Sequence, residues 1–314
     1  IMVRWLEIIK ENKDLPQNNK TIPKKILNKR TSAMLLMILG SGLISLTGLI
    51  IRYMDFANAL QINLYRGLSL SVTILIIFIL KYRRHTLNKI IKVGKSGIAA
   101  GGFLALAGIC LIQAITTTTV ASTLFICASI PFITSLLAFV FLNERISQQA
   151  LITMVVAGFG VCLMMFSGLK TNSAYGVVMA LITAISFSGY AILIRKNKGI
   201  EMLPCVLISG LFISTFCLII LKGNIDISWK DLARCILLGS FISLIPSALF
   251  IYASRYIIAG ELTLFMLLEF SLGPFWVWIF VNEVPAYWTL IGGSFVMTSL
   301  IVFVWSEIKS KRTT

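Results

Sequence analysis

The sequence has little charge. Charged residues fill 13% of the 314 positions, hydrophobic residues fill 58%, and the mean hydropathy is +0.92. Soluble domains carry roughly twice that charged fraction. The composition therefore excludes an ordinary soluble protein and indicates a polytopic membrane protein.

The residues that enzymes and cofactor sites need are also scarce. The one histidine, His85, lies in a basic segment, and none of the six cysteines forms a CxxC pair. The cysteines fall in or beside apolar runs, which is typical of packing residues rather than disulfides or metal ligands. The segment VGKSG at 93–97 lacks the earlier glycine of a phosphate-binding loop, because Lys89 stands there. We expect no metal, no cofactor and no enzymatic activity.

The net charge of +16 would suggest a nucleic-acid partner in a soluble protein. Here the basic residues sit in short segments between apolar runs, so we expect no nucleic-acid binding. Residues 1–32 form a basic tail without the apolar core of a signal peptide, and residues 306–314 form a second short tail. The sequence does not indicate an oligomeric state.

A series of apolar runs fills the rest of the chain. Each run has about the 17–25 residues that cross a bilayer, and none alternates as a barrel strand would. The fold class that we predict is an all-α integral membrane protein with ten transmembrane helices, at about 33–51, 60–80, 97–114, 120–142, 149–168, 174–194, 202–221, 233–252, 261–281 and 287–305.

The connections between the runs predict the orientation. If the N-terminus is cytoplasmic, 22 of the 28 Lys and Arg residues fall in inner segments, five fall in outer segments, and Arg66 lies within a helix. This asymmetry is a strong positive-inside signal. We expect both termini in the cytoplasm.

Two apolar runs end alike, in FLNERIS at 141–147 and FVNEVPA at 280–286. Asn143 and Asn282 are 139 residues apart, as are Glu144 and Glu283. If the chain holds two copies of a five-helix unit, the odd number forces the copies into opposite orientations, an arrangement common in secondary transporters. The alternative is a chance recurrence of two letters.

These motifs resemble the drug/metabolite transporter superfamily, with two EamA-type repeats at 33–168 and 174–305. In the first repeat, Pro131, Glu144 and Gly158 match the family pattern. An earlier family glycine falls near Thr153 or Met154, which is a departure. The resemblance implies a ten-helix transporter of small organic molecules, with helices 3, 4, 8 and 9 among those around a central cavity.

In the second repeat, Glu269, Glu283 and Gly292 match the family pattern. The family proline after the first glutamate is replaced by Phe270, and Pro274 follows four residues later, so the sequence leaves open where helix 9 bends.

Arg66, in LYRGLSL, matches an arginine common in the family, and its counterpart 139 residues on is Cys205. It could extend toward the outer interface, bond to backbone carbonyls or contact substrate.

Glu269 is the leading candidate for substrate binding or coupling. An ionisable side chain about eight residues inside a transmembrane helix is costly and suggests function. It could bind a cationic group of the substrate or take up a proton that drives exchange. The alternative is a structural partner for a polar residue on a neighbouring helix.

Other candidates are an aromatic residue and several small polar ones. Trp276 lies two helical turns beyond Glu269 and could face an organic cation, or it could belong to an interfacial aromatic belt. Polar stripes could line a cavity or hydrogen-bond between helices; their members are Ser243, Ser247, Ser186, Tyr190, Ser122 and Ser129. We expect structural or gating roles for Arg66, Pro131, Glu144, Pro274 and Glu283.

The sequence thus predicts a secondary transporter of a small organic metabolite, such as an amino acid or an organic cation. It would work by alternating access in a bacterial inner membrane, through export or exchange coupled to a proton or a counter-substrate. The alternatives are a lipid flippase or scramblase and, with less support, a membrane-embedded enzyme.

Overall fold

The computed structural model describes residues 24–54, 56–117, 120–165, 174–281 and 287–310, and all regular secondary structure in these ranges is helical. The elements are α2 Lys24–Ile44, α3 Leu46–Arg52, α4 Ala59–Tyr82, η1 Arg83–His85, α5 Thr86–Ile91, α6 Gly94–Thr117, α7 Val120–Cys127, α8 Ile130–Leu142, α9 Gln148–Met165, α10 Ala174–Lys196, α11 Leu203–Leu221, α12 Trp229–Leu237, η2 Leu238–Ser243, α13 Leu244–Ala253, α14 Ala259–Leu264, α15 Leu267–Val281 and α16 Tyr287–Ser310.

Every apolar run expected from the sequence contains helix. By length and composition, six helices in the described ranges could cross a membrane, at Lys29–Arg52, Ala59–Ile91, Gly94–Thr117, Ala174–Lys196, Leu203–Leu221 and Trp229–Ala253. Shorter apolar helices lie at Ile130–Leu142, Gln148–Gly160 and Leu290–Ser306. The first helix begins at Lys24, earlier than expected, and the expected end of the fifth run at residue 168 lies outside the described residues.

Three of the expected helices are interrupted. The first divides at Ser45, the fourth between Cys127 and Ile130, and the ninth between Leu264 and Leu267. Pro131 explains the second interruption, because it lacks the N–H that would continue the ladder and is favoured in the first turn of the new helix. The ninth helix breaks well before Pro274, so this proline does not cause the break.

The eighth expected helix contains a π turn, η2, between α12 and α13. Pro246 follows in the first turn of α13, and it has no N–H to donate to the preceding turn. A widened turn relieves the resulting crowding.

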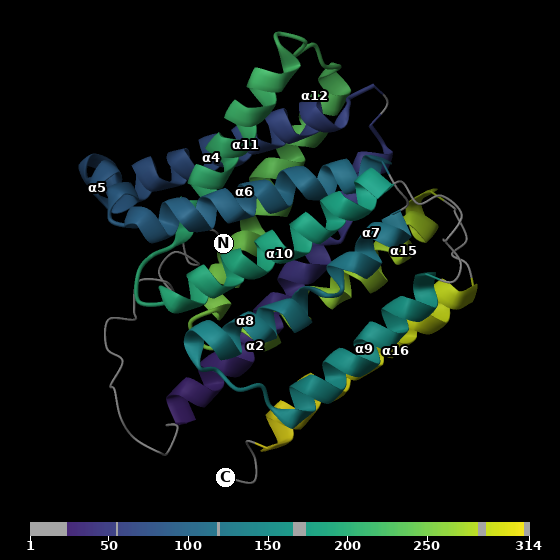
Figure 1. The fold of residues 1–314 in the computed structure, drawn as a ribbon. Coiled ribbons are helices and arrows are strands. Elements are labelled where there is room, and N and C mark those ends of the chain that lie inside the picture. The colour runs from purple at the N-terminus through teal and green to yellow at the C-terminus, as the bar shows by residue number, and fades with distance from the viewer. Residues whose placement is uncertain (1–23, 55, 118–119, 166–173, 282–286, 311–314) are drawn as a thin grey trace.

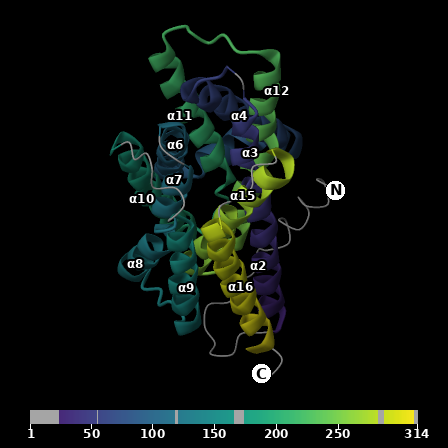
Figure 2. The ribbon, with the colours of Figure 1, turned by 90° about the vertical axis from the view of Figure 1, so that its right-hand side faces the viewer.

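The helices pack as neighbouring pairs from distant parts of the chain. Figure 1 shows α9 and α16 side by side along one edge, while α6 runs beside α10, and α4 beside α11. The pair α2 and α13 is a further extensive contact. Viewed from the side, α9, α16 and α2 extend together toward the C-terminus, and α12 lies at the other extreme (Figure 2).

Two of these pairs depend on glycine. A Cβ on Gly160 of α9 would lie 2.6 Å from the carbonyl oxygen of Gly292 in α16, and a Cβ on Gly67 of α4 would lie 2.9 Å from that of Gly210 in α11. Glycine therefore allows the two backbones of each pair to approach closely.

Large apolar side chains cover much of the outer surface. Leu136, Phe139, Val140 and Phe141 of α8 are each more than half exposed, and Leu80 of α4 is 74% exposed. Such a surface is unfavourable in water and suits the hydrocarbon of a bilayer.

Candidate functional site

Glu269 lies in the first turn of α15, directly after the break in the ninth helix. The sequence places it inside a continuous helix, whereas the structure places it at a helix N-terminus. The main-chain N–H groups of Leu268 and Glu269 donate to the carbonyls of Phe265 and Met266, three residues back, so the carboxylate follows a tight turn. Among the described residues, its side chain forms no ion pair.

The breaks in the fourth and ninth helices are close together. Cys127, the last residue of α7, lies near enough to Glu269 for the carboxylate to act on its thiol electrostatically. Cys127 is buried, and so are Leu267 and Leu268 just before Glu269. The half-buried carboxylate therefore lies between two interrupted helices, beside apolar side chains.

Tyr190 belongs to a buried aromatic cluster between α10 and α13. Its ring stacks on Phe250 at 5.6 Å between centroids, and Phe187 meets both rings edge-on. Tyr190 is 1% exposed, and its hydroxyl has no hydrogen-bond partner among the described groups. Ser186, one turn earlier on α10, is also buried.

The predicted serines of the eighth helix are bonded mainly within the bundle. Ser247 donates to the carbonyl of Ser243 at 2.7 Å, and Ser240 forms a 2.9 Å hydrogen bond with Thr73 of α4. Ser129, in the break between α7 and α8, donates to the carbonyl of Ile126 at 2.6 Å. These hydrogen bonds are typical of side chains that pack between helices. Ser243 and Ser247 are only half-buried.

Trp276 connects two helices. Its indole Nε1 donates to Ser45 Oγ at 2.7 Å, at the point where the first helix divides. Ser45 in turn donates to the carbonyl of Gly42 at 2.6 Å. The indole N–H is therefore already used by the protein, and any contact with a ligand would come from the ring.

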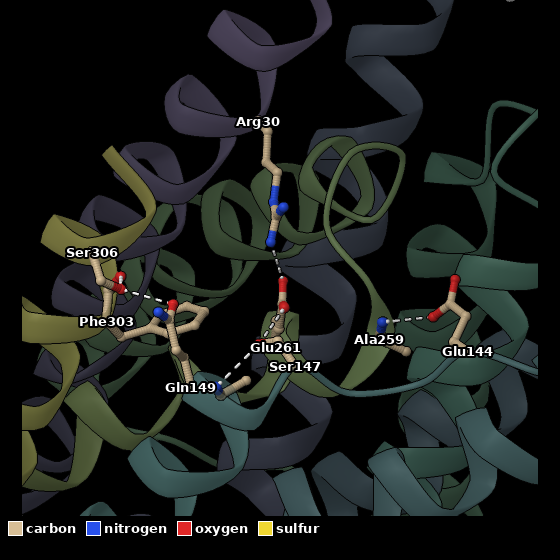
Figure 3. Close-up of polar contacts among 9 residues, drawn as sticks. Arg30, Glu144, Ser147, Gln149, Ala259, Glu261, Phe303 and Ser306 are labelled. Carbon is tan, nitrogen blue, oxygen red and sulfur yellow. Dashed lines mark hydrogen bonds and ion pairs between the residues drawn. The ribbon is translucent and has the colours of Figure 1, made fainter. Parts of the chain in front are cut away.

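Glu144 joins three segments at one end of the bundle. We call this the terminal end, because α2 begins and α16 ends there. Its Oε1 accepts from Arg195 Nε of α10 at 2.6 Å, and its Oε2 accepts from the backbone N–H of Ala259, which begins α14 (Figure 3). Arg195 also donates to the carbonyl of Ser254 at 2.5 Å.

Glu261 forms a second junction at the same end. Its carboxylate accepts from Arg30 of α2 at 2.8 Å and lies 3.5 Å from the hydroxyl of Ser147, just before α9 (Figure 3). Glu261 is 2% exposed. Figure 3 also shows Ser306 of α16 directed toward Gln149 of α9, at 3.1 Å.

Arg66 is held inside the bundle. Its Nη2 donates to Asn63 Oδ1 at 3.2 Å, one turn earlier on α4. A Cβ on Gly108 of α6 would lie 2.8 Å from Nη2, so this glycine leaves room for the guanidinium. Arg66 Nε and Asn63 Nδ2 are buried without a partner among the described groups.

Some predicted residues cannot be compared with the structure. Glu283 lies outside the described residues, as do the side chains of Ser122 and Pro274. The Asn–Glu repeat is therefore described at its first copy only, where Asn143 ends α8 with a left-handed backbone, φ 53°.

The sequence interpretation did not select Asn63, Arg195 or Glu261. Asn63 precedes Arg66 by three residues, a spacing that puts two side chains on one helix face, and this signal was available. The partners of Arg195 and Glu261 are 51 and 231 residues away in the chain. Only the tertiary arrangement brings them together.

Comparison with known proteins identifies the first half of the chain. Residues 31–166 match the model of the EamA-like transporter family, a family of the drug/metabolite transporter superfamily. This part of the chain is therefore similar to EamA-like transporters. The protein is thus a multi-pass membrane protein related to transporters of small molecules.

The fold extends over most of the chain. The chain is similar to a solved structure whose title reads only "Crystal structure of protein". The TM-score is 0.71 and the sequence identity is 13%, and the match covers 88% of this chain and 98% of the other. At that identity the likeness concerns the fold alone. No curated protein sequence matches the chain.

Proposed function

We propose that this EamA-like protein is a secondary transporter of a small organic metabolite that works by alternating access. Its ten helical segments form two five-helix repeats of opposite orientation, residues 33–168 and 174–305. Transport proceeds by export or exchange, and a gradient of protons or of a counter-substrate drives it. The main observation that supports this proposal is the pattern of contacts between the helices.

If the two repeats have the same fold, each contact between helices should have a counterpart after the repeats are interchanged. The observed contacts come close to this. We number the helical segments one to ten along the chain. If the two repeats are interchanged, segment one takes the place of segment six, two takes the place of seven, and six takes the place of one. The contact of segments three and six, α6 with α10, then corresponds to that of eight and one, α13 with α2. The contact of four and six, α8 with α10, corresponds to that of nine and one, α15 with α2.

Three further contacts map onto themselves under this exchange. They are segments two with seven, four with nine, and five with ten, which are α4 with α11, α8 with α14, and α9 with α16. A chance arrangement of ten helices would not produce both sets of contacts, so the pattern supports inverted repeats that can rock against each other.

The charge distribution supports a cytoplasmic terminal end. Basic residues concentrate in the segments at this end, as the positive-inside rule requires of the cytoplasmic side. Cysteine introduced at exposed Asn88 should resist an impermeant thiol reagent in intact cells, whereas cysteine at exposed Asp226 should react. Reaction at Asn88 without permeabilisation would reject this topology.

Glu269 is the proposed centre of substrate binding or coupling, since it is a carboxylate at a helix break without an ion-pair partner among the described residues. A screen of water-soluble metabolites by thermal stabilisation would supply a substrate, because a ligand of the folded state raises the melting temperature. Counterflow of that substrate in proteoliposomes would then demonstrate transport and exclude a lipid scramblase.

Glu269→Gln, which keeps the size and removes the charge, should reduce transport at least tenfold, and Glu269→Asp is the control that retains the charge. If the carboxylate couples protons, Glu269→Gln should lose proton-driven accumulation and retain exchange. If it binds a cationic group, substrate affinity should fall instead. Parent-like transport by Glu269→Gln at every pH would assign this residue a structural role.

A further inference from the structure

Buried Asn63 and half-buried Arg66 have more hydrogen-bond donors than the described residues satisfy. Asn63 is 0% exposed, and its Oδ1 accepts from Arg66 Nη2. A guanidinium has only N–H donors, so Asn63 must turn its oxygen toward Arg66 and leave its amide nitrogen without an acceptor. Arg66 Nε and Asn63 Nδ2 are thus two unpartnered donors one helical turn apart.

No carboxylate among the described residues neutralises Arg66. The titratable groups nearest to it are the thiols of Cys217 in α11 and Cys235 in α12, which supply no counter-charge. Asp231, one turn before Cys235, is bonded to Arg234 at 2.8 Å and to the backbone N–H of Phe56 at 3.2 Å. A buried guanidinium without a counter-charge is unfavourable in a protein interior, and more so in a membrane.

The guanidinium packs directly against the neighbouring helix. Gly108 of α6 faces Arg66 Nη2, and a single added methyl group would come within 2.8 Å of it. Gly108 and Arg66 come from different segments of the first repeat, α6 and α4. A positive charge and free donors therefore coincide at one place within the bundle, beside a glycine.

We propose that Arg66 and Asn63 bind a carboxylate group of the transported molecule. The missing partner must accept hydrogen bonds, because both free groups are donors, and it must be negative, because the site carries an uncompensated positive charge. A planar carboxylate fits the edge of a guanidinium and can accept from the adjacent amide. This inference deepens the proposed function, since it assigns an acidic or zwitterionic substrate to the same transporter.

The first test uses acetate as the probe on the purified full-length protein in detergent. Saturating acetate should raise the melting temperature of the parent by about 2–5 °C more than chloride at equal ionic strength. Arg66→Gln should lose most of this difference, and Arg66→Lys should keep part of it because a lysine retains the charge without the planar fork. The exposed Arg52→Gln, which removes a charge elsewhere, should respond like the parent.

Two further variants keep the test informative if Arg66→Gln fails to fold. Asn63→Asp supplies an internal carboxylate, so it should melt at a higher temperature than the parent without acetate and should lose the acetate response. Gly108→Ala keeps every charge but places a methyl group within 2.8 Å of Nη2, which must shift the guanidinium, so it should weaken the response. An equal acetate response in Arg66→Gln and the parent would overturn the site.

Inorganic phosphate separates a carboxylate from a phosphate group. A larger shift with phosphate than with acetate would overturn the assignment to a carboxylate, and so would equal shifts with acetate and chloride. These readouts measure binding alone. If the protein performs counterflow but binds no anion, the carboxylate site is rejected and the transport proposal stands. If it binds the anion but performs no counterflow, the transport proposal is rejected and the anion site stands.

Discussion

The two ends of the helical bundle are held together by different chemistry. At the terminal end, carboxylates connect separate segments: Glu144 with Arg195, Glu261 with Arg30, and Glu201 with Lys81. At the opposite end, neutral side chains reach main-chain carbonyls: Tyr53 bonds to Phe280 at 2.9 Å, Tyr65 to Ile225 at 2.5 Å, and Gln61 to Asp226 at 2.9 Å. Asp231 is paired with Arg234 within α12 and also accepts from the backbone N–H of Phe56 at 3.2 Å, so one carboxylate connects segments at this end as well.

This difference bears on the proposed alternating-access mechanism. Ion pairs at a protein surface respond to salt and to substitution of either partner, whereas hydrogen bonds to main-chain carbonyls respond little to salt. Opening that end would require Glu144 and Glu261 to release Arg195 and Arg30.

The largest effect is expected at Glu144. Glu144→Gln preserves the shape but leaves Arg195, whose side chain is 10% exposed, without its counter-charge. The free energy of unfolding should fall by about 2–3 kcal/mol, below the loss for a fully buried pair because the site is partly exposed. Denaturant titration in detergent micelles would measure this loss, and transport rate should change more than substrate choice.

A double variant tests whether the pair is the cause. Glu144→Gln combined with Arg195→Gln removes both charges and should recover part of the lost free energy. Additive losses in the double variant would show that the two residues act independently. A clear change of substrate selectivity in Glu144→Gln would argue against a gating role.

A smaller effect is expected at Glu261. Glu261→Gln should lower the free energy of unfolding by about 1–2 kcal/mol, because Arg30 is 26% exposed and water can partly replace the carboxylate. High salt should reduce the difference between this variant and the parent. A difference that does not change between low and high salt would contradict an electrostatic contribution.

The helical segments were predictable from the sequence, but their interruptions and partners were not. The bilayer requires long apolar runs with internally bonded backbones, so hydropathy locates helices such as α6 and α10 within a few residues. The break before Leu267 has no proline to signal it, and it changes the position of Glu269 from mid-helix to a helix start.

The candidate site was predictable only in part, for a related reason. Glu269 and Arg66 stand out because charges are rare within apolar runs. The pairing of Glu144 with Arg195 depends on how distant helices pack. The free donors of Asn63 become visible only when every neighbour is known, since an asparagine in a sequence carries no sign of an unsatisfied amide.

The smallest effect is expected at the opposite end of the bundle. Tyr65→Phe removes the hydroxyl that bonds to Ile225 and keeps the ring, so the free energy of unfolding should fall by about 0.5–1 kcal/mol. Because the lost bond is neutral, the change should be equal at low and high salt, in contrast to that at Glu261. The same denaturant titration at two salt concentrations measures both variants. A loss at Tyr65 that exceeds the loss at Glu144, or that shrinks with salt, would remove the proposed distinction between the two ends.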